Sequence, residues 1–148
     1  MRRLAACWLL AAAVGCSGVA PGLDQPRLGE LGPGAVSDYP SLVASLRAAG
    51  ATVEPGDDVD QPFFPVTGKM LRIDGEEVQV FQFAGAEQAA AQAARISPTG
   101  ATVGTAKIYW IGVPHFYRAG KLLVLYVGGS ERVLKTLETA FGRQFAGQ

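Results

Sequence analysis

Histidine, cysteine and an excess of basic residues are what this 148-residue sequence has little of. It contains one histidine, His115, and two cysteines, Cys7 and Cys16. A zinc site built from histidine and cysteine needs three or four such ligands, and His115 has no second histidine and, with Cys7 and Cys16 used as described below, no free cysteine to join it. Lysine and arginine number 13, as do aspartate and glutamate. Without a basic excess, the composition argues against a nucleic-acid-binding protein.

Motifs for catalysis and nucleotide binding are also missing. No serine stands in a Gly-x-Ser-x-Gly elbow. Gly128-Gly129-Ser130 precedes a helix and could hold an anion, but Glu131 follows it and no Walker lysine is present. Asp57, Asp58 and Asp60 lack the spacing, glycine and final glutamate of an EF-hand, so we interpret them as part of a solvated loop rather than a calcium site. The sequence therefore predicts no catalytic, cofactor-binding or metal-binding residue.

A membrane-spanning run is absent as well, although a shorter apolar run stands near the start. Leu4–Val14 has eleven residues, whereas a spanning helix needs about 20. Two arginines precede the run and small residues follow it, which is typical of a signal peptide. The segment Ala13-Val14-Gly15-Cys16 resembles the lipobox of bacterial lipoproteins, except that leucine is usual where Ala13 stands. The resemblance implies that residues 1–15 are removed and that Cys16 carries a diacylglyceryl group.

The alternative for this segment is an ordinary signal peptide cut after Ala20. Gly18 and Ala20 would then fill the small-residue sites, but Pro21 after the cut is unfavourable. Lipidation also explains the cysteines, because Cys7 leaves with the signal and Cys16 would otherwise be an unpaired thiol in an oxidising compartment. Two or three acyl chains hold a protein at a membrane more firmly than one chain does.

Residues 16–36 are expected to form the lipidated cysteine and a flexible tether. Five glycines and three prolines lie among residues 17–34, without a helical or strand period. A coil of this length spans roughly 20–25 Å on average. Ser17 replaces the aspartate that retains many lipoproteins in the inner membrane, so the resemblance favours the outer membrane where the host has one. The remaining 11 basic and 13 acidic residues sum to −2, which argues against electrostatic docking on anionic lipid.

Residues 37–148 are expected to form a single α+β domain, with a mainly antiparallel sheet of about five strands and two or three helices. Leu122–Val127 is apolar on both faces, which indicates a central strand covered on both sides. Helical and strand periods and turn residues predict a helix at 40–49, a strand at 51–54, a loop at 55–65, a hairpin of 69–73 and 76–83, a helix at 86–96, a strand at 107–111, a hairpin of 116–118 and 121–127, and a helix at 130–141.

The two hairpins, each followed by a helix, form a weak two-fold ββα repeat. Ser37 or Asp38 is expected to cap the first helix, and Ser130 the last. A shift of 44 positions aligns Val80 with Val124, Gly85 with Gly129 and Glu87 with Glu131.

A cluster of aromatic residues late in the chain supplies the candidate binding surface, which comprises Trp110, His115, Phe116 and Tyr117. These side chains either fill one core or leave an exposed patch for a protein or small ligand. The stretch 114–128 resembles a segment of small bacterial lipoproteins with no assigned activity. That resemblance implies an envelope location and no particular reaction.

The sequence therefore favours a lipid-anchored extracytoplasmic domain that binds an envelope protein or a small ligand and catalyses no reaction. A small envelope hydrolase that uses His115 with Asp57, Asp58 or Asp60 is the alternative. A His115→Ala variant that kept its fold and lost a hydrolytic activity would favour that alternative. A structural lipoprotein within a larger envelope complex is a third interpretation.

The lipoprotein interpretation predicts the mass of the protein purified from its native membrane. Intact mass spectrometry is expected to show a chain that begins at Cys16 and is heavier by two or three acyl groups. An unmodified chain cut elsewhere would contradict the interpretation, and Cys16 would then be a free thiol or part of an intermolecular disulfide in a secreted protein.

Overall fold

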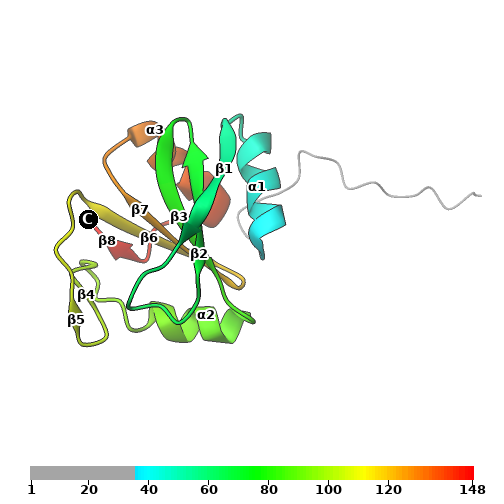
Figure 1. The fold of residues 1–148 in the computed structure, drawn as a ribbon. Helices are drawn as coiled ribbons and strands as arrows, with labels where there is room; N and C mark the ends of the chain where they lie inside the picture. The colour runs from blue at the N-terminus through cyan, green and yellow to red at the C-terminus, as the bar shows by residue number, and fades with distance from the viewer. Residues whose placement is uncertain (1–35) are drawn as a thin grey trace, which may run out of the picture.

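The structure, a computed structural model, describes residues 36–148 (Figure 1). The signal peptide, Cys16 and nearly all of the tether lie outside these residues. No helix within the described part is long and apolar enough to cross a bilayer. In chain order, the elements are α1 (Tyr39–Ala48), β1 (Val53–Val59), β2 (Gly68–Ile73), β3 (Glu76–Gln82), α2 (Ala86–Ala93), β4 (Thr102–Val103), β5 (Ala106–Lys107), β6 (Pro114–Ala119), β7 (Leu122–Val127), α3 (Glu131–Phe141) and β8 (Ala146–Gly147).

Six of the strands form one antiparallel sheet in the order β1-β2-β3-β7-β6-β8, and β4 and β5 form a separate ribbon. This arrangement confirms the α+β class and the mainly antiparallel sheet, with six strands in place of about five. The additional strand is β8, which pairs with β6 through His115 and Phe116. Two residues are too few to show a period of two, so no sequence pattern identified β8.

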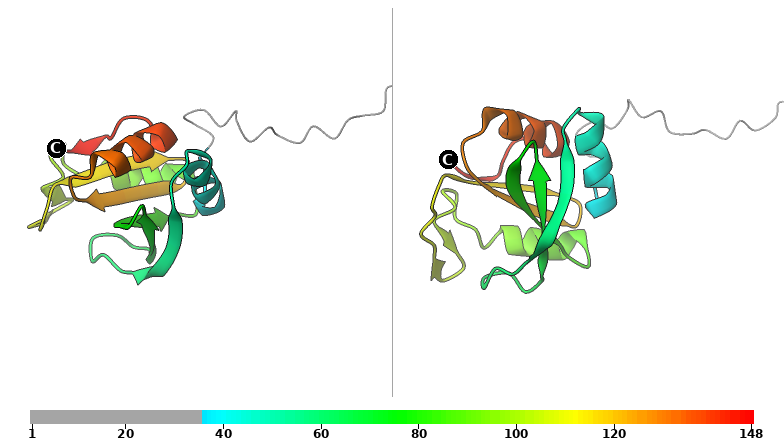
Figure 2. Two further views of the ribbon diagram at one scale, coloured as in Figure 1. Left: turned by 90° about the horizontal axis from the view of Figure 1, so that it is seen from above. Right: turned by 45° about the horizontal axis from the view of Figure 1, so that its top comes forward.

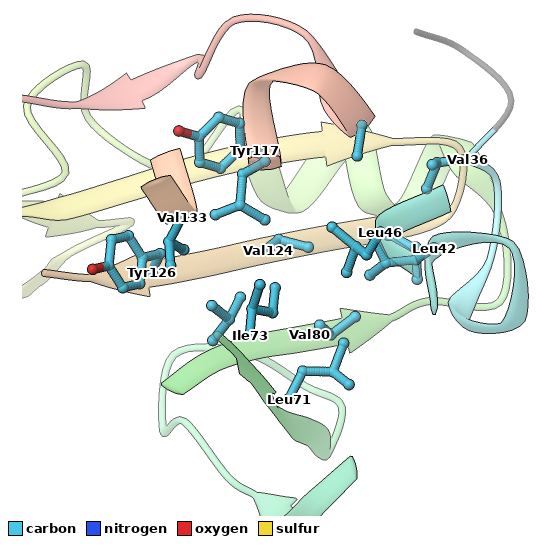
Figure 3. Packing of buried hydrophobic residues seen from close by; sticks show 14 of the residues in the cluster. Val36, Leu42, Leu46, Leu71, Ile73, Val80, Tyr117, Val124, Tyr126 and Val133 are labelled. Carbon is cyan, nitrogen blue, oxygen red and sulfur yellow. The ribbon is translucent and has the colours of Figure 1, made fainter. Parts of the chain in front are cut away.

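Helices cover both faces of the sheet. Figures 1 and 2 show α2 on one side of the strands, with α1 and α3 on the other. Alternate residues of β7 therefore meet different helices: Leu122, Val124 and Tyr126 pack with α1 and α3 (Figure 3), whereas Leu123 and Leu125 pack with α2. All five of these side chains are buried, which confirms the predicted central strand covered on both faces.

The ββα repeat holds for the two hairpins and not for their helices. Val80 and Val124, which the sequence repeat aligns, lie directly opposite each other where β3 pairs with β7. The hairpin β2–β3 and the hairpin β6–β7 are therefore related by a two-fold rotation about the Val80–Val124 pair. Since α2 and α3 pack on opposite faces, the relation ends where each helix begins.

The predicted loop at 55–65 is wrong in its first half, because β1 continues to Val59. The pairing of β1 with β2 shifts register between Pro55 and Asp58, and this irregularity lets the edge strand accommodate a proline. Asp57 and Asp58 are exposed on this strand, and Asp58 forms an ion pair with Lys69 of β2.

The predicted strand at 107–111 is also wrong, because β5 ends at Lys107. Its β-forming residues have no neighbouring strand to pair with apart from the two residues of β4. Residues with high strand propensity form a strand only where their side chains can pack on the surface of a sheet. Tyr109 and Ile111 consequently project into solvent.

Capping follows the prediction at α1 and departs from it at α3. Asp38 accepts a hydrogen bond from the Ser41 backbone N–H in a capping box. Ser130 occupies the N-cap position of α3, but its side chain makes no capping hydrogen bond. The Ser130 backbone N–H instead donates to the Tyr126 hydroxyl at 3.0 Å, so a core tyrosine helps to fix the start of this helix.

A Gly120→Ala substitution is expected to destabilise the domain by about 2–4 kcal/mol, because Gly120 has a positive φ and its added Cβ would meet the Ser37 backbone. The matched control is Gly129→Ala, where a Cβ meets open space, with an expected change within about 0.5 kcal/mol. Urea denaturation of the two variants measures the difference, and equal stabilities would contradict the packing of the turn against Ser37.

Candidate functional site

His115 lies on β6 with both ring nitrogens engaged by the protein. Its side chain is 5% exposed and stacks on the ring of Tyr126, with centroids 5.9 Å apart. Nε2 lies 3.1 Å from the Gly128 carbonyl oxygen, and Nδ1 lies 2.6 Å from Oε1 of Gln144. Because a carbonyl only accepts, Nε2 carries a proton. Nδ1 then accepts from a rotated Gln144 amide in the neutral ring or donates to Oε1 in the cation.

Tyr117 lies two residues after His115 on β6 and points to the same side of the sheet. Its hydroxyl has no hydrogen-bond partner within the described residues. Its side chain is fully buried, and its oxygen contacts no donor or acceptor at bonding distance within residues 36–148. Burial, together with the nearby carboxylate of Glu138, raises the pKa of this phenol to about 12. Tyr117 is therefore a neutral donor at physiological pH. An unsatisfied buried group of this kind costs about 1–3 kcal/mol.

Both residues line a pocket of about 390 Å³ between β6, α3 and the segment that ends in β8. We name it the His115–Tyr117 pocket. Polar groups converge on it, including the Glu138 carboxylate and the Arg143 guanidinium. The remaining lining residues are Leu134, Gln144 and Gln148. A pocket of this size with several convergent polar groups suits a small ligand.

Phe116 and Trp110, the other two residues of the predicted surface, lie on the opposite face of the sheet. Phe116 is fully buried in the cluster beneath α2. Trp110 is half-buried against Phe116, and its indole N–H donates to the Gly100 carbonyl at 2.8 Å. Strand alternation thus separates Phe116 from His115 and Tyr117, and Trp110 packs against Phe116 from the preceding loop, so the four residues form two sites rather than one surface.

A second candidate site is the connection between β5 and β6, residues 108–113, which we name the apolar loop. Tyr109 is 83% exposed, Ile111 is fully exposed and Val113 is partly exposed. The Lys107 ammonium lies 5.4 Å from the centre of the Tyr109 ring, within cation–π range. Exposed apolar side chains that gather in one place mark interaction surfaces more often than isolated ones do.

A groove of about 360 Å³ runs beside the apolar loop. The loop forms one wall, and β2 and β3 contribute Met70, Glu77 and Gln79 from the other. Gln79 is held by a hydrogen bond from Gln61 at 2.8 Å. The sequence reasoning missed this groove because it assigned residues 107–111 to the sheet.

The structure does not bring His115 together with the aspartates. Asp57 and Asp58 lie on β1 and Asp60 directly follows it, and β1 and β6 are separated by four inter-strand spacings of about 4.8 Å each. Within residues 36–148, no three histidine, cysteine, aspartate or glutamate side chains lie close enough to share a metal ion.

Compared with known proteins, the chain matches no family model, no curated protein and no solved structure.

A Tyr117→Phe variant is expected to be as stable as the parent or more stable by about 1 kcal/mol, because it removes a buried hydroxyl that lacks a partner. Tyr126→Phe is the matched comparison. It removes an acceptor for the Ser130 N–H and a donor to Glu76, and is expected to cost about 1–2 kcal/mol. Denaturation with urea ranks the two variants. A larger loss for Tyr117→Phe would show that its hydroxyl is satisfied in the folded protein.

Proposed function

We propose that this chain is a lipid-anchored, extracytoplasmic binding domain whose apolar loop contacts a partner protein of the cell envelope. The observation that carries the proposal is the exposure of Tyr109 and Ile111, two positions apart in one loop. Burying one such side chain in an interface contributes about 1.5–3 kcal/mol. Large apolar and aromatic side chains of this kind dominate the binding energy of protein interfaces.

The position of the apolar loop supports a partner other than the anchoring membrane. Val36, the first described residue, leads into α1, and the connection between β5 and β6 lies at the far end of the domain in every view (Figures 1 and 2). A domain tethered through the segment before Val36 therefore presents the loop away from its point of attachment. The groove beside the loop also suits a protein, because a bilayer surface has no side chain to insert into it.

The anchor rests on the resemblance of Ala13-Val14-Gly15-Cys16 to a lipobox, and Ser17 favours the outer membrane in a host with two membranes. The engagement of both His115 nitrogens favours binding over hydrolysis. A general base must accept a proton from its substrate or from a water, and His115 would first have to release Gly128 or Gln144.

A photo-crosslinking amino acid at position 111, introduced into the full chain in its native cell, tests the proposal. The expected result is one discrete protein adduct, formed at position 111 and not at the matched control position 87, an exposed site on α2. From position 109, the same adduct should fall at least tenfold in an Ile111→Ser variant, since the variant removes an apolar anchor of the interface. Adducts with lipid alone, or equal labelling from position 87, would overturn the proposed protein partner.

A further inference from the structure

We propose that the His115–Tyr117 pocket binds a small zwitterion that carries an ammonium and a carboxylate group, namely a free amino acid or a short peptide. This inference concerns a site on the α3 side of the sheet and goes beyond the partner contact proposed for the apolar loop. It rests on the charges at the pocket, on an unpartnered buried donor, and on the pocket's size.

Two opposite charges line the pocket without neutralising each other. Glu138 lies near the end of α3, and Arg143 follows Gly142, which ends that helix. Both side chains are exposed, and neither forms an ion pair within residues 36–148. A ligand with one positive and one negative group can satisfy both at once, whereas a simple anion or cation would face one like charge. Arginine suits the carboxylate in particular, because its planar fork can donate two parallel hydrogen bonds.

The Tyr117 hydroxyl supplies an independent indication of a ligand. It is fully buried, lines this pocket and has no hydrogen-bond partner in the described part of the chain. A protonated hydroxyl can donate one hydrogen bond and also accept one, so a polar group of a ligand can satisfy it in either direction. The Glu138 carboxylate is close enough to raise the pKa of Tyr117 but does not accept from it. The carboxylate of a zwitterion can accept from this hydroxyl and its ammonium can donate to it, so either group supplies the partner that Tyr117 lacks.

The C-terminal segment forms one wall of the pocket that Tyr117 also lines. Gln144 and Gln148 line the pocket from this segment, which joins the sheet through the two residues of β8. Both amides carry donors and acceptors. The exposed Gln148 can turn toward a ligand, whereas Gln144 Oε1 lies 2.6 Å from Nδ1 of His115. A volume of about 390 Å³ lies at the small end of ligand pockets, which suits one amino acid or a dipeptide.

The test is calorimetric titration of the full chain, purified in detergent, with the 20 standard L-amino acids and with L-alanyl-L-alanine. At least one of these probes is expected to bind. Its N-acetyl derivative, which lacks the ammonium, and its amide, which lacks the carboxylate, should each bind at least tenfold more weakly. Absence of binding by every probe would overturn the proposal, as would a derivative that binds as tightly as its parent.

Variants then assign the two charges and the hydroxyl. Glu138→Gln and Arg143→Gln should each weaken binding about tenfold, while the matched controls Glu87→Gln and Arg118→Gln, at exposed positions outside the pocket, should leave it unchanged. Tyr117→Phe should weaken binding about fivefold or more without a loss of stability. A loss of binding that tracks a loss of folding, or equal effects of pocket and control variants, would overturn the site.

Discussion

The burial of β7 on both faces is the constraint on which the rest of the structure depends. Five consecutive side chains of this strand, Leu122 to Tyr126, are excluded from water. The strand therefore needs a layer of helices on each face, and α1 with α3 and α2 supply these two layers. At about 1.5–3 kcal/mol for each fully buried apolar side chain, the five side chains of β7 contribute on the order of 10 kcal/mol to the driving force for folding. The two flanking strands, β3 and β6, direct alternate side chains to the same two faces as β7, because they pair with β7 in register.

The alternation on β6 decides where the polar side chains of the site lie. His115 and Tyr117 face α3, while Phe116 between them enters the apolar cluster beneath α2. A polar ring and a phenol are costly to bury, and both lie where α3 ends and the C-terminal segment begins, with Tyr117 also part of the buried cluster beneath α1 and α3. His115 offsets its burial with two hydrogen bonds. Tyr117 does not, and its unsatisfied hydroxyl is the one buried side-chain polar atom in the described residues that lacks a partner.

Local patterns predicted most of the fold because they act within a few residues. The Asp74-Gly75 turn, the capping box at Asp38 and the two apolar faces of β7 all lie where the sequence indicates. What the sequence could not show depends on distant parts of the chain. Pairing with β2 extends β1 through Pro55, and a missing neighbour leaves Tyr109 exposed despite its strand propensity.

The candidate sites were predictable only in part, for the same reason. The sequence singled out His115, Phe116, Tyr117 and Trp110 as one surface, because they are close along the chain. Period-two alternation could have divided them, but only if residues 114–119 were known to form a strand covered on both faces. Glu138 and Arg143 were not singled out at all. They reach the pocket through the packing of α3 on β6, a long-range contact that no local pattern encodes.

One residue, Gly128, supports both the apolar loop and the His115–Tyr117 pocket. The Gly128 N–H donates to the Val113 carbonyl at the base of the loop, at 3.0 Å. The Gly128 carbonyl accepts from Nε2 of His115 at 3.1 Å. Gly128 has no Cβ, and an added one would overlap the Tyr126 hydroxyl that holds the start of α3. The loop, the histidine and the helix are therefore positioned by hydrogen bonds around the end of β7, so the two candidate sites keep a fixed relation although they open on different faces of the sheet.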